Sequence, residues 1–315
     1  MKIGDRLTQR SAYGKTLAEI GEEVPQIVVL DADISKSTCT YFFARMFPKR
    51  AFNLGVAEQN MFGVAAGLAM VGKIPFASTY ACFATMRACE QIRTSIAYPH
   101  LNVKIVATHG GIEVGWDGVT HQGTEDVGIM RSIPGMVVLV PADPQATVHA
   151  THAISKYEGP VYMRLGRNPM PVLYGECFKF TLGKAHVLQT GADIAIMTTG
   201  PILAEAIKAA TVLEKEGISS YLLDVHTIKP IDREAIVRAA KTTGAVVTCE
   251  DHNINGGLGS AVSEVLVEEY PVPMMRVGLQ DTFGESGEPK ALYEKYKLSE
   301  RFIVEAARRA LKRKM

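Results

Sequence analysis

The sequence predicts an α/β protein of two domains, each a mostly parallel sheet flanked by helices. Three observations lead to this prediction. At 315 residues the chain exceeds the usual size of one hydrophobic core, which favours two domains. Short β-branched segments alternate with segments of helical apolar spacing, which is the pattern of βαβ units. The alternation stops once, in a stretch rich in turn residues, and then resumes.

The first domain is expected over residues 1–175. Apolar runs predict buried strands at 27–31, 74–78, 103–108, 136–140 and 160–165. Apolar residues at helical spacing predict helices at 4–21, 57–71, 81–97 and 143–157. A short strand at 52–54 leads through Gly55 into the second of these helices. Because helices connect consecutive strands, the sheet is expected to be parallel and covered on both faces.

A linker is predicted over residues 176–191, because the rhythm fails from about residue 166 in a stretch rich in turn residues. The second domain is expected over residues 192–315. Its predicted strands are 193–199, 218–224 and 245–250, and its predicted helices are 201–216, 232–242 and one from 259. The glycines at 256–259 lack the spacing of a dinucleotide fingerprint and indicate a tight turn between strand and helix.

Composition excludes several classes of function. The net charge of +1, with both signs interleaved, favours neither nucleic acid nor an anionic membrane surface as a partner. The five cysteines have no metal-binding spacing, so reduced thiols and no metal site of the chain's own are expected. Neither a signal peptide nor an apolar stretch long enough to span a bilayer is evident. A cytoplasmic protein is therefore predicted.

Glu58 lies in the segment Gly55-Val56-Ala57-Glu58-Gln59-Asn60-Met61, within the first turn of the predicted helix 57–71. An acid at this position can simply complement the helix dipole. The neighbouring residues, however, are mostly apolar and offer almost no solvated face. A carboxylate buried in such a setting is suited to proton exchange with a ligand.

The stretch THGGIEVGWDGVTHQ, residues 108–122, follows the strand at 103–108. Ligands of doubly wound sheets bind at the carboxyl ends of strands, so this loop emerges where a site is expected. Its glycines allow close approach of the backbone to a ligand, and His109, Asp117 and His121 supply titratable groups. A flexible surface loop is an alternative, whereas a zinc site fits poorly because the spacing matches no common pattern.

Two aromatic residues, Tyr80 and Phe83, follow the strand at 74–78 in the segment YACFATMR. Aromatic side chains at positions i and i+3 of a helix most often pack in a core. They can equally form an apolar wall against a flat heteroaromatic ring.

With the Glu58 motif, the sequence resembles the C-terminal half of transketolase over nearly all of its length. The Glu58 motif occurs throughout the thiamine diphosphate enzymes, whereas the loop at 108–122 is more specific, since it is similar to the transketolase loop in both histidines and in the Asp-Gly-x-Thr-His run. The resemblance implies a thiamine diphosphate pyrimidine-binding fold, followed by a transketolase C-terminal domain-like fold.

The resemblance also implies a cofactor site. Glu58 would hydrogen-bond N1′ of the aminopyrimidine, Tyr80 and Phe83 would enclose the ring, and Asp33 would lie near the cofactor and the subunit contact. Met86 stands where transketolases often carry a tyrosine. The implied cofactor-binding residues are Glu58, Tyr80, Phe83, Met86 and Asp33.

On the substrate side, the resemblance implies that His109, Asp117 and His121 bind and deprotonate sugar hydroxyls. Together with Glu58, the two histidines are the expected catalytic residues. The substrate phosphate would be held by Ser37, Arg10 and Arg167, with Arg164 as an alternative to Arg167. A guanidinium suits this role because it binds phosphate oxygens bidentately.

Transketolase also has an N-terminal domain whose Gly-Asp-Gly…Asn motif holds magnesium and the cofactor diphosphate, and this sequence contains no Gly-Asp-Gly. It therefore resembles the C-terminal subunit of a split transketolase. The implied partner is an N-terminal transketolase subunit that binds Mg²⁺ (or Ca²⁺), in an α2β2 heterotetramer acting on sugar phosphates. An acidic segment of this chain at Glu250-Asp251 is the alternative metal site.

The predicted reaction is transfer of a two-carbon ketol unit between sugar phosphates in the pentose phosphate pathway. Three alternatives remain open: a protein like 1-deoxyxylulose-5-phosphate synthase, the β subunit of a 2-oxo acid dehydrogenase, and a non-catalytic stabilising or regulatory subunit. His109 favours transketolase over the first, and the Asp117/His121 pair and the arginines disfavour the second. The presence of Glu58 and both histidines disfavours the third.

Overall fold

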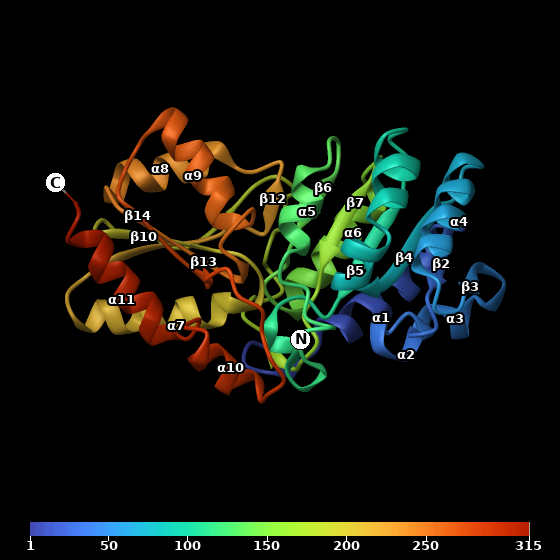
Figure 1. The fold of residues 1–315 in the computed structure, drawn as a ribbon, viewed down its shortest axis with the longest axis horizontal. Coiled ribbons are helices and arrows are strands. Elements are labelled where there is room, and N and C mark those ends of the chain that lie inside the picture. Colours follow the sequence, from blue (N-terminus) through green and yellow to red (C-terminus); the bar gives the residue numbers. More distant parts are fainter. Residues whose placement is uncertain (315) are drawn as a thin grey trace.

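Two sheets lie side by side along the long axis of the molecule, one in each half of the chain (Figure 1). The computed structural model describes residues 1–314. The larger sheet has the strand order β12-β6-β7-β5-β4-β2-β3, and the smaller has the order β14-β13-β10-β11-β9. Neighbouring strands run parallel except at β12–β6 and β11–β9. The predicted α/β fold with two mostly parallel sheets is confirmed.

Alternating strands and helices build the first domain. Its sheet contains β2 (Ile27–Asp31), β3 (Ala51–Asn53), β4 (Ile74–Tyr80), β5 (Lys104–Thr108), β6 (Val137–Leu139) and β7 (Val161–Arg164). The helices are α1 (Gln9–Glu23), α2 (Ser35–Thr38), α3 (Tyr41–Met46), α4 (Glu58–Met70), α5 (Asp126–Ser132) and α6 (Pro144–Lys156). A small antiparallel pair, β1 (Arg6–Leu7) with β8 (Met170–Pro171), joins the two ends of the domain.

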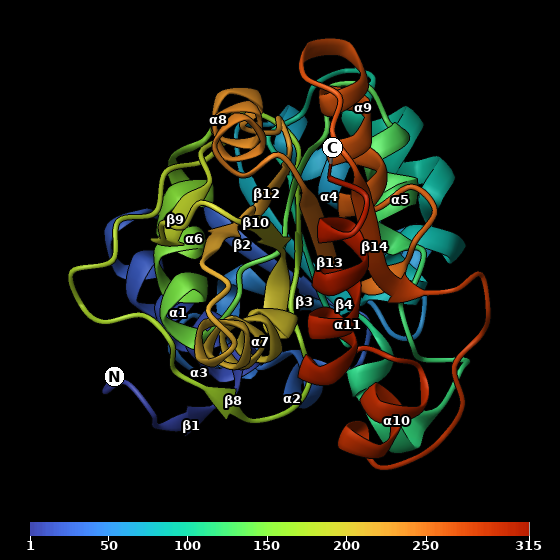
Figure 2. The ribbon, with the colours of Figure 1, turned by 90° about the vertical axis from the view of Figure 1, so that its left-hand side faces the viewer.

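The second domain repeats this architecture on a smaller scale. Its strands are β9 (His186–Gln189), β10 (Ile194–Thr198), β11 (Ser220–Asp224), β13 (Val246–Asn253) and β14 (Met274–Leu279). Its helices are α7 (Leu203–Lys215), α8 (Arg233–Thr243), α9 (Leu258–Glu269), α10 (Pro289–Lys295) and α11 (Glu300–Leu311). Figure 2 shows α8 and α9 on one face of this sheet and α7 and α11 on the other.

Local sequence signals explain where several helices begin. The Thr8 hydroxyl accepts a hydrogen bond from the Ser11 amide at the start of α1. Asp143 caps α6 in the same way and is followed by a proline, whose missing N–H costs nothing at the first helical position. Asp232 caps α8. Such caps satisfy backbone donors that would otherwise lack partners at a helix start.

One strand crosses between the two halves of the chain. β12 (Thr227–Lys229) follows β11 of the second sheet but pairs with β6 at the edge of the first. One apolar cluster likewise runs through both domains, from Leu30 and Ala77 under α4 to Met197 and Leu223 in the second sheet. The domains are therefore fastened by a shared strand and a shared core.

The structure differs from the sequence-based expectations at several strands. β1 lies within the predicted helix 4–21, which begins only at Gln9 as α1, and no strand was predicted at β8 or β14. Residues 186–189 of the predicted linker form β9, an edge strand of the second sheet that pairs with β11. β12 lies where no strand was predicted. Both segments are short edge strands and are stabilised by pairing rather than by an apolar run of their own.

In residues 1–314, no helix combines the length and the apolar character that crossing a membrane requires.

Candidate active site

Glu58 is the first residue of α4 and is only 2% exposed. The turn before it passes through Gly55 at φ +73°, a backbone conformation that glycine adopts at low cost. The Oε2 atom of Glu58 lies 3.6 Å from Nη1 of Arg87 but accepts no hydrogen bond from any residue within 1–314. Because a buried acceptor is costly to leave unpaired, this oxygen is available to a donor from outside the chain.

An aromatic wall stands next to this carboxylate. Tyr80 ends β4, and Phe83 begins a π-helical segment at Phe83–Arg87, a distortion frequent at functional sites. The two rings are stacked with centroids 5.7 Å apart. The Arg87 guanidinium lies 4.9 Å from the centre of the Phe83 ring and so connects this wall with Glu58. Met86 follows in the same segment and is 50% exposed.

Both predicted histidines join this wall. His109 stacks on Tyr80 with ring centroids 3.8 Å apart, and His121 meets Tyr80 and Phe83 edge-on at 5.8 and 5.4 Å. These four residues are called the ring cluster below. They come from β4, the π-helical segment and both ends of the loop at 108–122, so the carboxyl ends of β4 and β5 build the site as predicted for a parallel sheet.

His109 is held as a neutral imidazole. Burial lowers its pKa far below the usual range, and the charges of Arg10, Arg167 and His121 lower it further. The residue is 2% exposed and has φ +61°, a strained conformation for histidine that the surrounding structure must maintain. A neutral ring of this kind donates a hydrogen bond at one nitrogen and accepts one at the other.

Arg10 and Arg167 are near enough to His109 for their charges to lower its pKa. Arg10 donates hydrogen bonds to the carbonyl oxygens of Ser37 and Arg167. Nε of Arg167 lies 3.5 Å from Oδ2 of Asp117. The predicted set of Arg10, Ser37, Asp117 and Arg167 is therefore continuous, and it presents two guanidinium groups against one carboxylate.

Arg164 has a different role from Arg167. Its side chain is buried, with Nε 3.3 Å from Asp126, and it donates to the carbonyl oxygens of Gly123 and Asp251. The side chain of Arg167 is 31% exposed. Arg164 therefore belongs to the interior between the domains, and Arg167 is the arginine available to a ligand.

Sequence reasoning did not single out Glu113, which supports Arg167. Its Oε1 atom accepts hydrogen bonds from the backbone amides of Arg167 and Asn168 at 2.6 and 3.3 Å. Burial raises the pKa of Glu113 to about 7, and the nearby Asp251 adds to the increase. Glu113 lies inside the loop at 108–122, but no spacing or motif distinguishes it from an ordinary loop acid.

The loop glycines have a different purpose from the one expected. A Cβ atom at Gly110 would overlap the Arg164 side chain, and one at Gly111, where φ is +82°, would overlap the Asp251 carboxylate. Gly118 is similarly close to Ser286. Gly110 thus makes room for the Arg164 side chain, and Gly111 and Gly118 let the loop pack against the second domain, so the expectation that they admit a ligand was wrong at these positions.

Asp33 is connected through Asn53 to the turn that precedes Glu58. It is exposed, has φ +64°, and accepts a hydrogen bond from Nδ2 of Asn53 at 2.8 Å. Asn53 in turn accepts from the Gly55 amide. Asp33 is thus placed at the entrance to α4, where it is free to contact a neighbouring molecule.

The acidic pair Glu250-Asp251 is occupied within the protein. Glu250 accepts hydrogen bonds from the amides of Leu258 and Gly259 at the start of α9, and Asp251 accepts from Ile112 and Glu113. In the part of the chain that the structure describes, no three His, Cys, Asp or Glu residues are grouped to hold a metal ion. The alternative metal site at these carboxylates therefore has no structural support.

Two family models match the chain. Residues 5–171 match the family model "Transketolase, pyrimidine binding domain", and residues 183–303 match "Transketolase, C-terminal domain". The chain is 47% identical over 307 residues to a putative transketolase C-terminal section of Methanocaldococcus jannaschii, covering 96% of both chains. It is also 47% identical over 305 residues to a 6-deoxy-6-sulfo-D-fructose transketolase subunit of a Clostridium species, covering 97% of this chain and 95% of that protein.

Among solved structures, a split-gene transketolase described as an inactive β4 tetramer is 53% identical and superposes with a TM-score of 0.92. The match covers 98% of this chain and 100% of that one. Human transketolase is 34% identical over 311 residues, and this chain spans 49% of its length. The chain therefore belongs to the transketolase family, in which it corresponds to the C-terminal subunit of a split transketolase.

Proposed function

We propose that this chain supplies the pyrimidine side of a split transketolase and, with an N-terminal partner subunit, transfers a two-carbon ketol unit from a ketose phosphate to an aldose phosphate. The pentose phosphate pathway is the proposed setting. One observation carries the proposal: Glu58 is buried at the start of α4 with a carboxylate oxygen that no residue within 1–314 hydrogen-bonds. The ring cluster, Arg10 and Arg167 lie at the same end of the first sheet, where β4, β5 and β7 have their carboxyl ends.

The residues around Glu58 fit the aminopyrimidine of thiamine diphosphate. The unpaired Glu58 oxygen suits a protonated ring nitrogen, and the stacked Tyr80 and Phe83 suit a flat ring. Thiamine diphosphate, when bound, supplies the electron sink for the carbon–carbon bond chemistry. Glu58 holds the proton at N1′ of the pyrimidine, and the aromatic wall keeps water from that end. Met86 and Asp33 would contact the cofactor at its margins.

The residues beyond the aromatic wall fit a hydroxylated, anionic substrate. His109 and His121 would hold sugar hydroxyls and move their protons, and Asp117 would bind a further hydroxyl. Because burial and the arginines keep His109 neutral, its ring can donate a hydrogen bond at one nitrogen and accept one at the other. Arg10 and Arg167 would bind the phosphate, with Ser37 beside them.

The proposal requires a partner chain, and the outer face of α4 supports one. This face carries Gly63, Gly67 and Met70, and a Cβ at either glycine would have no atom within 4 Å. Val56 and Met70 are about three-quarters exposed, at 74% and 76%. An apolar helix with small residues outward is suited to close packing against another protein. The N-terminal subunit, with Mg²⁺ (or Ca²⁺) and the cofactor diphosphate, is proposed to lie there in an α2β2 assembly.

A second substrate class has specific support. One relative at 47% identity is a 6-deoxy-6-sulfo-D-fructose transketolase subunit, and another, at 36%, is one of the subunits of an apulose-4-phosphate transketolase of Phocaeicola vulgatus. A sulfonate, like a phosphate, is a tetrahedral anion with oxygens that a guanidinium can bind. Arg10 and Arg167 therefore suit either anion, and 6-deoxy-6-sulfofructose is the second candidate donor.

The test is a reconstituted assay. The chain is purified with an N-terminal partner subunit, thiamine diphosphate and Mg²⁺, and ketol transfer to ribose 5-phosphate is measured from xylulose 5-phosphate and from 6-deoxy-6-sulfofructose. Pyruvate with glyceraldehyde 3-phosphate, and pyruvate with an artificial electron acceptor, test the two related alternatives. Transfer from a ketose donor supports the proposal. Turnover of pyruvate alone, or of none of these substrates by a folded complex, contradicts it.

A further inference from the structure

A cavity of about 440 Å³ lies in the second domain, between α11 and the edge strand β14. Its volume is within the range of small-molecule sites. The residues lining it include Arg276 and Val277 of β14, Phe302 and Arg309 of α11, and Lys297 from the turn before α11. None of the residues assigned above to the candidate active site lines this cavity.

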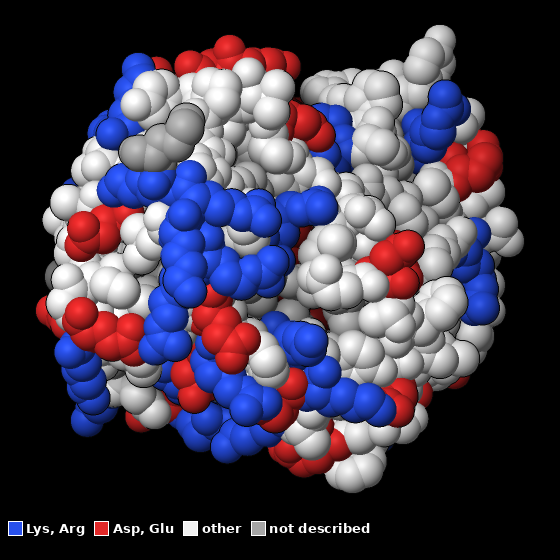
Figure 3. Space-filling view, turned by 60° about the vertical axis from the view of Figure 1, so that its left-hand side comes forward, with Lys and Arg blue, Asp and Glu red and all other residues white. Residues whose placement is uncertain are grey.

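The lining is strongly cationic. Arg276, Lys297, Arg309 and Arg313 carry positive charge, and Glu305 is the one acid among the lining residues of the described chain. Figure 3 shows Lys and Arg side chains gathered around a hollow on this face of the molecule. This local excess contrasts with the net charge of +1 for the whole chain. Like charges placed together repel one another, so an anion bound among them would relieve the repulsion.

These cations lack partners within the protein. No residue within 1–314 forms an ion pair or hydrogen bond with the charged groups of Lys297, Arg309 or Arg313, and Arg276 donates one bond, to the carbonyl of Ile254 at 2.9 Å. Two other arginines of α11 are paired: Arg301 with Glu294 and Arg308 with Glu216. The arginines of α11 that lie outside the cavity are therefore paired with glutamates, whereas Arg309, which lines the cavity, has no acidic partner in the described chain.

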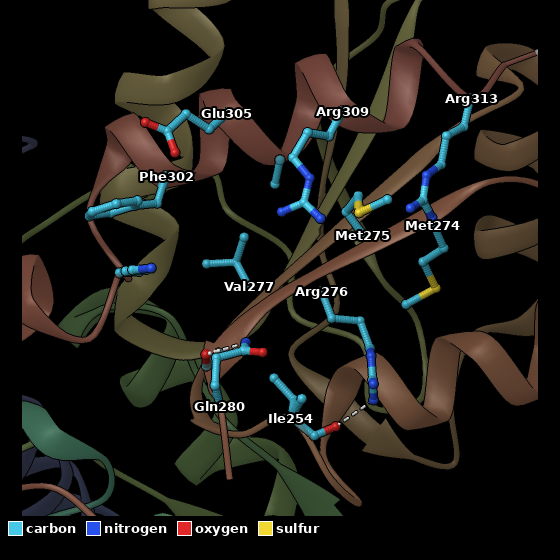
Figure 4. A pocket seen from close by; sticks show the side chains of 13 residues that line it. Ile254, Met274, Met275, Arg276, Val277, Gln280, Phe302, Glu305, Arg309 and Arg313 are labelled. Atoms are coloured by element: carbon cyan, nitrogen blue, oxygen red, sulfur yellow. Dashed lines mark hydrogen bonds between the residues drawn. The ribbon is translucent and has the colours of Figure 1, made fainter. Parts of the chain in front are cut away.

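The two ends of the cavity differ in character. Figure 4 shows Arg309 reaching toward β14, with Arg276 and Arg313 on the same side and Phe302 at the opposite end. Met275 and Val277 form an apolar floor between them. Lys297 has φ +61°, a conformation in which glycine or asparagine is usual after a helix, so a lysine is retained there at a conformational cost. The shape suits a ligand with several negative charges at one end and a flat ring at the other.

We propose that this cavity binds a nucleoside polyphosphate, with its phosphates held by Arg276, Arg309 and Arg313 and its base beside Phe302. Guanidinium groups bind phosphate oxygens bidentately and more strongly than neutral donors do. Aromatic faces stack on nucleobases. The inference rests on residues separate from those of the proposed transketolase function, and so it stands or fails independently of that function.

The test is titration calorimetry of the full chain, in complex with its partner subunit and saturated with thiamine diphosphate, against ATP, tripolyphosphate and adenosine. We expect one ATP per chain, weaker binding of tripolyphosphate and no binding of adenosine. R276Q and R309Q should each weaken ATP binding by about tenfold or more. Two matched controls, R308Q on the same helix and R10Q at the candidate active site, should bind ATP as the unmodified chain does.

Several results would overturn the inference. One is the absence of ATP binding up to about 1 mM. Another is a loss of ATP affinity in R308Q equal to the loss in R276Q and R309Q. The third is an affinity for tripolyphosphate that equals the affinity for ATP. Tighter binding of a single-stranded oligoribonucleotide than of ATP would indicate a nucleic-acid surface instead. Because the four arginines tested are at least partly exposed, thermal melting of each variant is expected to match the unmodified chain, and R313Q serves as a substitute for any variant that does not.

Discussion

Glu58 and Arg87 form an arrangement that serves both the fold and the proposed chemistry. The buried carboxylate has a cation at 3.6 Å, which limits the cost of burial, yet one oxygen remains without a hydrogen bond in the described chain. The same arginine lies over the Phe83 ring. Arg87 therefore ties the carboxylate to the aromatic wall, and the two are expected to act on one ring-shaped ligand together.

Replacing Glu58 by glutamine tests this arrangement directly. Glu58→Gln keeps the size and shape of the side chain but cannot exchange a proton, so the turnover number should fall by about 100-fold or more. The exposed Glu90→Gln is the matched control and should keep its activity. Steady-state ketol transfer with the partner subunit and saturating cofactor gives the comparison, and circular dichroism verifies the fold. Full turnover by a folded Glu58→Gln enzyme would remove the catalytic assignment.

The two histidines are predicted to act on substrate and not on the cofactor. His109→Ala and His121→Ala should each lower the turnover number by about 10-fold to 1,000-fold, while the cofactor's dissociation constant stays near that of the unmodified enzyme. The exposed His152→Ala is a control for the loss of an imidazole. Kinetics at saturating cofactor and calorimetric cofactor titration separate the two effects. A large rise in the cofactor's dissociation constant with unchanged saturated turnover would contradict this role.

Glu113 predicts a pH dependence of stability. Its pKa is about 7 in the folded protein against 4.5 unfolded, so between these values the folded state holds a proton that the unfolded state has lost. Glu113 therefore contributes fully to the free energy of unfolding below about pH 4.5. This contribution decreases as the pH rises from 4.5 to about 7. Glu113→Gln removes this dependence, and its oxygen can still accept from Arg167 and Asn168.

The stability of Glu113→Gln relative to the unmodified chain should thus increase from pH 4.5 to 7, by up to about 3 kcal/mol, and then level off. Urea unfolding at several pH values measures it, with the exposed Glu176→Gln as control. A difference that is constant with pH would show that Glu113 does not hold its proton in the fold.

The site residues that the sequence predicted are those attached to recognisable motifs. Glu58 follows a glycine turn, and the histidines flank a loop at a strand end. The sequence did not reveal Arg87 and Glu113, because their roles depend on contacts that only the fold creates. Arg87 contacts a ring four residues away on a π-helical turn, and Glu113 contacts backbone amides more than fifty positions along the chain. The choice between Arg164 and Arg167 likewise required burial, which composition does not reveal.

At the scale of elements, α4 carries the main evidence for a partner. Its inner face packs Met61, Phe62 and Ala65 into the core, while its outer face shows two glycines to open space. Glycine inside a helix costs about 0.5–1 kcal/mol relative to alanine. Two such residues on an exposed face fit the proposed packing of this helix against a partner subunit.

Replacing Gly63 or Gly67 by leucine should weaken association with the partner subunit without destabilising the isolated chain. Gly63→Leu and Gly67→Leu meet no neighbour within 4 Å, so the isolated chain should be as stable as before or more stable by about 0.5–1 kcal/mol. Association with the partner subunit should weaken by about tenfold or more, because the added side chain blocks close packing. Thr211→Leu, on an exposed position of α7, is the control. Unimpaired assembly measured by analytical ultracentrifugation would place the partner elsewhere.

The same scale shows what periodicity could and could not predict. The strands β2 and β10 and the helix α6 lie within one or two residues of their predicted ranges, because each has a continuous apolar run or a clear cap. The predicted helix 81–97 is present but contains two π-helical segments, Phe83–Arg87 and Gln91–Ala97. Apolar spacing does not distinguish these from α-helix, although the first of them positions Phe83 and Arg87.

At the scale of the whole molecule, the sequence predicted two parallel-sheet domains but not how they are joined. β12 pairs across the boundary, Asp251 reaches the loop at 108–122, and Arg164 connects Asp126 to the second domain. Each of these contacts joins residues that are far apart in sequence. The second domain therefore positions the loop that carries His109 and His121, and this provides a structural role for a domain that contributes none of the proposed site residues.

The chain alone is predicted neither to hold thiamine diphosphate tightly nor to catalyse ketol transfer. Glu58, Tyr80 and Phe83 would bind only the pyrimidine end, whereas the diphosphate is strongly anionic and ordinarily requires a divalent cation with carboxylate or amide oxygens to hold it. Within residues 1–314 no suitable group of acidic side chains exists, and Glu250 and Asp251 are used in internal hydrogen bonds.

Calorimetry decides the question. The purified chain is titrated with thiamine diphosphate and Mg²⁺, first alone and then with an N-terminal partner subunit. We expect binding only in the second case, in the ratio of one cofactor to one copy of each chain, because a twofold-symmetric α2β2 assembly would form two equivalent sites. The Glu58→Gln complex should bind the diphosphate end but remain inactive, which separates assembly from chemistry. Micromolar cofactor binding with ketol transfer in the absence of a second polypeptide would show that this chain holds the metal and the diphosphate itself.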